Sequence, residues 1–298
     1  MLSRSDELQL KRKAIIMAVI EEGGIGPKMF QQLLMRFGSP EELPGVSAAE
    51  FEEIPRFDEV RIGRLLKSLD NIDEYVGKIH DYISDDIDVC AITDEDYPGS
   101  IRNIDDPPPL FYCKGDPAAW SREYIALVGT TKASQGGLRL AVDFAKELVK
   151  RGYGIVSGLA AGIDSAAHLG ALKEKGTNIA VLGGGILEIY PEENKPLANL
   201  IAQSGLLISE YPPYKNVSKS GLVLRNRLIS AISKAVVVVQ VGEETQGELR
   251  TAGYAAKQAR PLFYGDPDNN LDYNRVKNCP GSIIKTVDSV EEIINYVV

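Results

Sequence analysis

Cysteine and tryptophan are scarce in this sequence, and its few cysteines form no pattern. The 298 residues include 3 Cys and 1 Trp. Cys90, Cys113 and Cys279 are widely separated and odd in number, so the sequence indicates neither a disulfide framework nor a zinc site. We therefore expect no bound metal, and no pattern in the chain predicts a cofactor.

Apolar runs long enough to cross a bilayer are also missing. Purely apolar runs such as Ala14–Ile20 and Ala235–Val239 are far too short to span a membrane. The amino terminus, MLSRSDELQLKRK, has no apolar core of the signal-peptide type. Hydrophobic residues make up 44% of the chain and charged residues 25%, as in ordinary globular proteins. We expect a cytoplasmic protein that does not bind membranes.

Positive charge is scarce overall but locally concentrated. The net charge of −9 argues, taken alone, against a nucleic-acid partner. Residues 120–235, however, contain 14 Lys and Arg against 9 Asp and Glu. Because salt screens charges beyond about 8–10 Å, the local sign matters more than the total. The chain therefore has a basic middle segment within an acidic protein, although ordinary scatter of surface lysines would give the same count.

Residues 1–75 have the pattern of a small all-α domain. KRKAIIMAVIEEGG carries apolar residues at helical spacing, and GIGPKMFQQLLMRFG predicts a turn and a second helix. Ser47 and Glu50 have the spacing of a capping box. The turns GIGP and LPGV resemble those of SAM or helix-hairpin-helix modules, which contact DNA phosphates. A purely structural bundle is the simpler interpretation.

Residues 76–298 are predicted to form an extended Rossmann-like domain of the α/β class. From Tyr124 onward, continuous apolar strands alternate with amphipathic helices, which indicates a doubly wound, mostly parallel sheet covered on both faces. The predicted strands are DVCAIT, LFYC, YIALVG, GIVS, NIAVLG, LLIS, AVVVVQV and PLFYG. The predicted helices are QGGLRLAVDFAKELVKRG, DSAAHLGALKEKG, PEENKPLANLIAQSG, GLVLRNRLISAIS and GELRTAGYAAKQA.

Four loops at the carboxyl ends of these strands are candidates for ligand binding, because ligands of open α/β sheets bind at that edge. The loops are GTTKASQGG, SGLAAGID, GGGILEIYP and VGEETQGE. Each precedes a helix N-terminus, where free N–H groups favour anions. Several such loops together indicate a phosphate-bearing ligand. Neither GxGxxG nor GxxxxGK[ST] is present, so the sequence supports neither a dehydrogenase nor a P-loop NTPase.

The stretch SGLAAGIDSAAHLGAL contains one of the two histidines of the chain. We expect Asp164 to be the N-cap of the helix, which places His168 one turn inside it. The helix dipole there favours a neutral imidazole. No GxSxG elbow is present, and no second histidine lies close in sequence. A hydrogen-bonding structural role or a ligand contact is therefore favoured over general-base catalysis.

Arg225 and Arg227 flank Asn226 in an otherwise apolar segment. A guanidinium group offers a planar fork that suits bidentate contact with phosphate. The alternative is that the two arginines neutralise Glu210 or another internal carboxylate. Because anion-receptive loops are predicted at the same sheet edge, we favour phosphate binding.

Six ordered blocks resemble the DNA-processing protein A (DprA/Smf) family over roughly residues 90–265. They are VGTTKAS, VSGLAAGIDSAAHLGAL, IAVLGGGILEIYPEENKPL, LISEYPP, LRNRLISAISKAVVVVQ and LRTAGYAAKQAR. The resemblance implies a non-catalytic protein that binds single-stranded DNA, forms a homodimer and hands the strand to the recombinase RecA during natural transformation. It also implies a small helical domain before the Rossmann-like one.

The resemblance further implies a DNA pocket built from the strand-end loops and the arginine block. Asp164, His168, Glu248 and Thr251 are expected to have structural or pocket roles. The residues expected to bind DNA or phosphate are Gly129, Thr130, Lys132, Ser134, Ser157, Gly158, Gly162, Gly183, Gly184, Gly185, Lys195, Arg225, Asn226 and Arg227.

This chain departs from the family pattern at several of these positions. Thr131 and Ala161 stand where the family has arginines, and the FPxRNR block has become LVLRNR. The block TQGELRTA adds Glu248, a carboxylate near the expected phosphate. Because phosphate contacts supply most sequence-independent affinity, these changes predict weaker or altered DNA binding. No winged-helix domain follows, so we expect a divergent member.

Two further hypotheses compete with DNA binding. Related Rossmann-like proteins hydrolyse nucleoside monophosphates at the N-glycosidic bond, and Glu248 is an imperfect match to their glutamate. This alternative predicts a nucleotide sensor or a phosphoribohydrolase-like enzyme with a closed small pocket, whereas DNA binding predicts a continuous positive groove. The remaining alternative is a partner-binding scaffold with a vestigial pocket.

Overall fold

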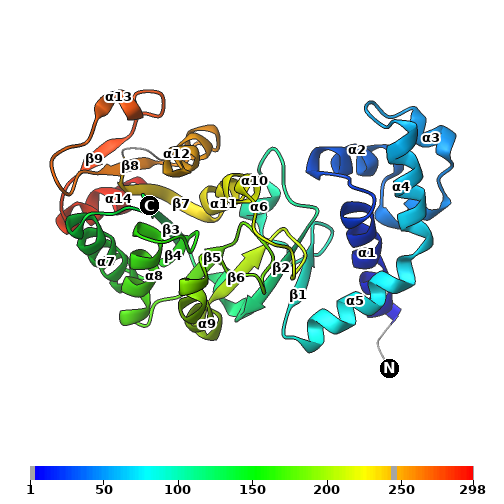
Figure 1. Cartoon of the computed structure of the whole chain (residues 1–298), viewed down its shortest axis with the longest axis horizontal. Coiled ribbons are helices and arrows are strands. Elements are labelled where there is room, and N and C mark those ends of the chain that lie inside the picture. Colours follow the sequence, from blue (N-terminus) through cyan, green and yellow to red (C-terminus); the bar gives the residue numbers. More distant parts are fainter. Residues whose placement is uncertain (1–3, 243–246, 298) are drawn as a thin grey trace. The chain divides into compact units, whose positions relative to one another are not determined.

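The computed structural model describes residues 4–242 and 247–297, coloured along the chain in Figure 1. It divides into two compact units, residues 1–112 and 113–298. The boundary predicted between residues 75 and 76 falls inside a helix, α5 (Ile72–Ser84). The division into a helical and a Rossmann-like folding domain stays a prediction.

Unit 1 is mainly helical, as the apolar spacing of its first 75 residues indicates. The Ser47 amide donates to the Glu50 carboxylate (3.0 Å), so the predicted capping box is present at the start of α3. The elements of unit 1 are α1 (Arg4–Glu21), α2 (Pro27–Phe37), the 3-10 helix η1 (Pro40–Gly45), α3 (Ala48–Glu52), α4 (Glu59–Asp70), α5, β1 (Asp88–Ala91), α6 (Gly99–Arg102) and β2 (Leu110–Gly115), whose last residues belong to unit 2.

Unit 2 confirms the predicted α/β class with a mostly parallel, Rossmann-like sheet. Each predicted strand from YIALVG to PLFYG forms, and neighbouring strands pair in parallel. The strands are β3 (Tyr124–Gly129), β4 (Gly154–Ser157), β5 (Asn178–Val181), β6 (Leu206–Ser209), β7 (Ser233–Gln240), β8 (Leu262–Gly265) and β9 (Ser282–Ile284). The helices are α7 (Gln135–Lys150), α8 (Ile163–Lys173), α9 (Lys195–Ser204), α10 (Lys219–Leu224), α11 (Asn226–Ile232), α12 (Gly247–Lys257), α13 (Tyr273–Val276) and α14 (Val290–Val297). Three 3-10 turns complete the unit: η2 (Pro117–Ser121), η3 (Glu192–Asn194) and η4 (Val287–Ser289).

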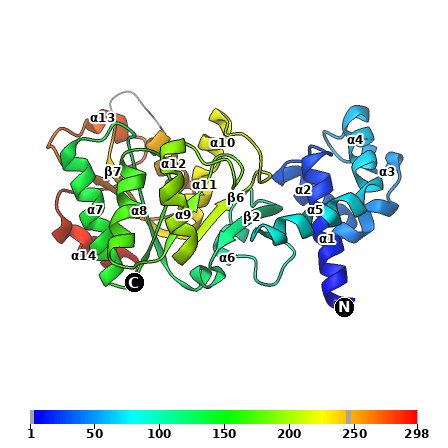
Figure 2. The same ribbon diagram turned by 60° about the horizontal axis from the view of Figure 1, so that its bottom comes forward.

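The strand order places a topological switch point between β3 and β7. Within unit 2 the order is β6-β5-β4-β3-β7-β8-β9. From β3 the chain builds outward to β6 on one side, then returns to add β7, β8 and β9 on the other. Figure 2 shows α7, α8 and α9 side by side over one face, while Figure 1 shows α11 and α12 across the sheet from α7. Ligands of doubly wound sheets bind at such a switch point.

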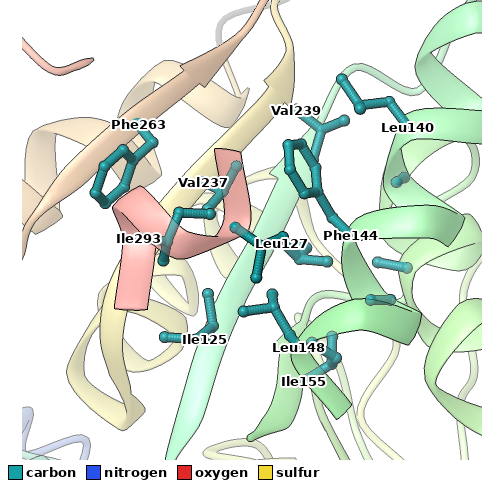
Figure 3. Packing of buried hydrophobic residues seen from close by; sticks show 14 of the residues in the cluster. Ile125, Leu127, Leu140, Phe144, Leu148, Ile155, Val237, Val239, Phe263 and Ile293 are labelled. Atoms are coloured by element: carbon teal, nitrogen blue, oxygen red, sulfur yellow. The ribbon is translucent and has the colours of Figure 1, made fainter. Parts of the chain in front are cut away.

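The main core lies between β3, β7 and the helices α7 and α14 (Figure 3). Ile125 and Leu127 point to the same face because side chains of a strand alternate, and Val237 does the same from β7. Phe144 and Leu148 of α7 lie one turn apart and cover these strand residues. This packing holds the carboxyl ends of β3 and β7 in fixed positions.

The structure corrects several predicted helix boundaries. The segment GLVLRNRLISAIS forms two helices, α10 and α11, that meet at Arg225. The segment PEENKPLANLIAQSG begins with the 3-10 turn η3 before α9. The elements after PLFYG, which are α13, β9 and α14, were not predicted. Within the described part of the chain, no helix has the length and apolar character needed to cross a membrane.

Candidate functional site

Two cavities lie at the carboxyl edge of the sheet, one on each side of the loop that follows β3. Cavity A has a volume of about 460 Å³ and cavity B of about 690 Å³. Both volumes fall within the roughly 300–1,000 Å³ typical of small-molecule sites. Consecutive residues of the β3–α7 loop face different cavities: Gly129 and Thr131 line cavity A, whereas Thr130 and Lys132 line cavity B.

Cavity A brings together residues from the loops after β3, β4 and β5 and from helices α8, α10, α11 and α12 around the switch point. Its walls combine apolar side chains with a few polar groups. The lining residues are Val128, Gly129, Thr131, Gly158, Ala160, Ala161, Asp164, Tyr190, Pro191, Lys219, Leu222, Val223, Arg225, Asn226, Ile229, Gly247, Glu248 and Thr251. Of the predicted site residues, this set includes Gly129, Gly158, Asp164, Arg225, Asn226, Glu248 and Thr251.

Cavity B lies between the β3–α7 loop, the end of β7 and the loop after β8. Ser134 caps α7, since its hydroxyl accepts the Gly137 amide (2.9 Å). The Ser134 amide in turn donates to Gln240 Oε1 (3.0 Å), whose Nε2 donates to Asp268 (3.2 Å). The lining residues are Thr130, Lys132, Ala133, Ser134, Gln240, Val241, Gly242, Asp268, Asn270, Leu271, Asp272 and Arg275.

Arg225 lies at the base of cavity A and is engaged by the protein itself. Its side chain is only 6% exposed. The guanidinium donates to the carbonyls of Gly158 and Val181, and one of its nitrogens lies 3.8 Å from the Asp164 carboxylate. Burial lowers the pKa of Arg225, and the nearby Asp164 opposes that shift. The structure therefore gives Arg225 the internal partners that we had named as the alternative to phosphate binding.

Arg227 also has an internal partner. Its guanidinium donates two hydrogen bonds to the carboxylate of Glu210, and the Arg227 side chain is buried. This is the neutralisation of Glu210 that the sequence left open as an alternative. Asn226, between the two arginines, lines cavity A and donates its amide to the carbonyl of Gly247 (3.2 Å). A DNA-binding role for the three residues stays a prediction.

The SGLAAGID turn forms hydrogen bonds to its own aspartate, Asp164. Asp164 is not the N-cap of α8, because Gly162 holds that position and Asp164 follows inside the first turn. Its carboxylate accepts the amides of Gly158 (3.1 Å), a residue expected to bind phosphate, and Ala160 (3.4 Å). Burial raises the pKa of Asp164, and the nearby Arg225 counteracts this. The Asp164 carboxylate thus satisfies two amides of the turn internally.

Two further residues of this turn have structural contacts. The Ser157 hydroxyl donates to the carbonyl of Leu127 (2.6 Å), which joins β4 to β3. Gly162 has a φ of +75°, and a methyl group there would approach the Thr130 carbonyl to 2.5 Å. Only glycine fits this position without strain. Neither residue lines cavity A or cavity B.

His168 is fully buried and does not reach either cavity. Its Nδ1 lies 2.9 Å from Asn178 Oδ1, so Nδ1 carries the proton because an amide oxygen only accepts. Its Nε2 has no hydrogen-bond partner among the described residues. Burial lowers the pKa of His168 to about 4, so the ring is neutral near pH 7. The ring joins α8 to β5 and does not contact the candidate site.

The GGG turn packs against protein rather than lining a cavity. Gly183, Gly184 and Gly185 are all buried, and none lines cavity A or B. A methyl group on Gly185 would overlap the carbonyl oxygens of Pro212 and Pro213. These glycines allow the segment after β6 to cross close to the loop after β5. Lys195 is exposed at the start of α9 and also lies outside both cavities.

Glu248 and Thr251 are buried on the first turns of α12 and line cavity A. The Gly242 amide donates to Glu248 Oε1 (2.9 Å), which ties the end of β7 to α12. Residues 243–246 of the predicted VGEETQGE loop lie outside the described residues. Within the described residues, no cluster of three His, Cys, Asp or Glu side chains could hold a metal ion.

Two residues that the sequence analysis did not select line cavity A. Lys219, the first residue of α10, is exposed, and no ion-pair partner of its ammonium occurs within residues 4–242 and 247–297. Tyr190 lies on the loop after β5 and is 55% exposed. An aromatic residue in a strand-end loop was a usable signal for Tyr190. No such signal pointed to Lys219, because the position of Lys219 depends on how residues 210–218 fold back.

The two positions at which the family resemblance predicts arginines also lie at this cavity. Thr131 and Ala161 both line cavity A, and both are exposed. An arginine at either position would therefore add a cation at the opening. Among the lysines and arginines that line cavity A, the described residues offer one exposed cation, Lys219, beside the buried Arg225.

Sequence comparison relates this chain to known proteins. The family model described as DNA recombination-mediator protein A matches residues 88–295. DNA processing protein DprA of Bacillus subtilis is 39% identical over 183 residues, which are 61% of this chain and 61% of that protein. Protein Smf of Synechocystis is 32% identical over 266 residues, which are 86% of this chain and 64% of that protein. The chain thus spans about three fifths of the length of these curated relatives.

Solved structures agree with the fold. DNA processing protein A of Streptococcus pneumoniae matches with a TM-score of 0.73 at 23% identity, covering 98% of each chain. DNA processing protein A of Helicobacter pylori, whose structure addresses its single-stranded DNA binding mode, matches with a TM-score of 0.63 at 28% identity. That match covers 71% of this chain and 97% of the Helicobacter chain.

Proposed function

The chain belongs to the DNA recombination-mediator protein A family, and on that premise we propose that it binds single-stranded DNA at cavity A without catalysing a reaction. The proposal extends to a cytoplasmic role in which the protein protects the strand and delivers it to a RecA-type recombinase. It also includes a homodimer, as the family resemblance implies.

The observation that carries the proposal is the position of Lys219 beside the apolar wall of cavity A. A nucleotide carries an anionic phosphate and an apolar base face, so it needs a cation and an apolar surface close together. Lys219 offers an exposed ammonium, and Leu222, Val223 and Ile229 supply apolar wall. Cavity A therefore suits one nucleotide of a strand, whereas the buried Arg225 supports the floor.

Binding of a fluorescent oligo-dT, measured by fluorescence anisotropy at low salt, tests this proposal. We expect the affinity to fall as salt rises, because phosphate contacts release counterions. Lys219→Ala should weaken binding, while Lys173→Ala should not, because Lys173 is exposed at the far end of α8 from the cavities. Absence of binding by the wild-type protein at low salt would contradict the proposal.

A nucleotide-hydrolysing function is the second candidate, favoured by one observation. Glu248 lines cavity A, which places a carboxylate in a cavity of nucleotide size. This carboxylate already accepts the Gly242 amide, so a backbone group holds it in place. Release of free base from a nucleoside monophosphate, lost in Glu248→Gln, would support this candidate. We expect no release, because the family premise supports binding.

The proposed homodimer and recombinase partner need separate measurements. Light scattering coupled to size-exclusion chromatography gives the mass of the particle in solution, which we expect to be twice that of the 32.5 kDa chain. On single strands that are already coated with another DNA-binding protein, strand exchange by a RecA-type recombinase should start sooner when this protein is added. A monomeric mass, or an unchanged lag, would contradict the corresponding part of the proposal.

A further inference from the structure

Much of the wall of cavity A is apolar and is not explained by phosphate binding. Leu222, Val223 and Ile229 of α10 and α11 line the cavity beside Val128 of β3. A phosphate gains nothing from such a surface, since it needs cations and hydrogen-bond donors. A flat heterocyclic base, by contrast, gains free energy when its apolar face leaves water. The wall therefore fits the base of a nucleotide rather than its phosphate.

Tyr190 is an aromatic ring at this cavity with most of its surface still in water. Its side chain is 55% exposed, although it lines cavity A with the adjacent Pro191. Large aromatic side chains are normally packed against other groups, and an exposed one at a cavity is a candidate for ligand contact. Tyr190 makes no aromatic or cation–π pair within the described parts of the chain.

The loop that carries Tyr190 is anchored on both sides. The Asn194 side-chain amide donates to the Leu159 carbonyl (2.8 Å) and contacts the Ser165 hydroxyl (2.9 Å), which attaches the loop to the β4–α8 turn. Its backbone amide donates to the Pro191 carbonyl (3.0 Å). On the other side, the Leu187 amide donates to the Pro213 carbonyl (2.9 Å). These contacts hold the loop in place before any ligand arrives.

We infer that Tyr190 stacks on a nucleobase that enters cavity A, and that this contact makes the site selective for single strands. The inference rests on the proposed function. In a duplex, neighbouring base pairs cover both faces of each base, so a ring in a cavity cannot reach them without unstacking the helix. In a single strand, a base turns out of the backbone at low cost. Lys219 at the same cavity then faces the adjoining phosphate.

The test compares oligo-dT of about 15 nucleotides, within the range of single-strand site sizes, with the same strand carrying abasic positions. We expect the wild-type protein to bind the abasic strand roughly 5- to 150-fold more weakly, as expected for loss of one stacked base. Tyr190→Ala should weaken binding to intact strands by a similar factor. It should also bind intact and abasic strands almost equally, because the stacking partner is then missing from both.

Two variants and one spectroscopic signal separate stacking from a structural role. Tyr190→Phe keeps the ring and should bind like the wild type. Tyr214→Ala removes another exposed tyrosine, one that does not line cavity A, and should not change binding. A 2-aminopurine placed in the strand should lose fluorescence on binding to the wild type and to Tyr190→Phe. It should lose much less on binding to Tyr190→Ala.

The outcomes distinguish this inference from the proposed function. If the wild-type protein binds no oligonucleotide, the proposed function fails, and the inference fails with it. If the wild type binds but Tyr190→Ala matches it on intact strands, abasic strands and 2-aminopurine quenching, only the stacking inference is overturned. If Tyr190→Ala does not fold, equal binding of intact and abasic strands by the wild type overturns the inference.

Discussion

Arg225 and Lys219 lie six residues apart and line the same cavity, yet their surroundings differ. Arg225 is buried with Asp164 and two carbonyls, whereas Lys219 is exposed. A buried guanidinium that is already neutralised supports the loops around it, and an exposed ammonium remains available to a ligand. The two cations should therefore respond differently to removal.

We predict that Arg225→Ala lowers the free energy of unfolding by about 3–5 kcal/mol, because it leaves the buried Asp164 carboxylate without its partner. Lys219→Ala should change it by less than about 0.5 kcal/mol, as for most exposed positions. Urea denaturation followed by circular dichroism measures both. An Arg225→Ala protein of wild-type stability that no longer binds oligo-dT would instead place the guanidinium in contact with DNA.

His168 predicts a pH dependence of stability. Its pKa is lowered by burial from 6.5 to about 4 in the folded protein, so below pH 6.5 the unfolded chain binds a proton that the folded protein does not. Stability is therefore lost as the pH falls from about 6.5 to about 4, by roughly 3 kcal/mol from this group. Urea denaturation at a series of pH values measures the loss.

The variant His168→Asn should lose less stability over that pH range than the wild type, whatever its stability at pH 7. His80→Asn is the matched control, because His80 is exposed on α5 and lies in water in both states. An equal slope for His168→Asn and the wild type would mean that the imidazole is protonated in the folded protein.

For single residues, the sequence predicted which side chains line the cavity better than it predicted the groups that these side chains contact. It selected Arg225, Asn226 and Glu248, and all three line cavity A. It could not decide between phosphate and carboxylate as the partner of Arg225, because Asp164 lies 61 positions away and only the folded chain brings the two together. Lys219 was missed for the same reason, whereas Tyr190 could have been selected as an aromatic residue in a strand-end loop.

Most strands of unit 2 could be predicted from the sequence. The strands β3 to β8 were predicted because each is a short, continuous apolar run followed by a helical pattern. β9 has three residues and α13 four, too few to establish any period. The break between α10 and α11 was missed because the apolar pattern continues through Arg225.

The glycine-rich turns give a prediction at this scale. Gly185→Ala should destabilise the protein by about 1–3 kcal/mol, because the methyl group would overlap the carbonyls of Pro212 and Pro213. Gly253→Ala, in α12, meets open space and should stabilise the helix by about 0.5–1 kcal/mol. Chemical denaturation of the two variants measures the difference. Equal effects would mean that the GGG turn does not pack as described.

For the whole molecule, the uneven charge matters more than the total. The net charge of −9 repels DNA at long range, while residues 120–235 carry an excess of positive charge. Added salt weakens both the repulsion of DNA by the net charge and its attraction by the basic segment. The dependence of affinity on salt therefore reports the cations that touch the strand rather than the net charge of the chain.

We predict that Lys219→Ala makes the slope of log affinity against log salt shallower by about 0.7, the value for one phosphate contact to a single strand. Thr131→Arg should strengthen binding and make the slope steeper by about the same amount, because residue 131 is exposed at cavity A. Anisotropy titrations at several salt concentrations measure both slopes. A Thr131→Arg protein with the wild-type slope would show that the strand does not pass this position.

The uncharged side chains of Thr131 and Ala161 should also affect how long a bound strand stays at the cavity. Affinity differences between closely related complexes lie mostly in the rate of dissociation. Under the proposed function, a strand bound at cavity A through Lys219, the exposed cation among the described lining residues, should therefore leave sooner than a strand bound by that lysine and two arginines at the same opening. Short residence suits a protein that passes its strand on, since each departure exposes a segment on which another protein can assemble.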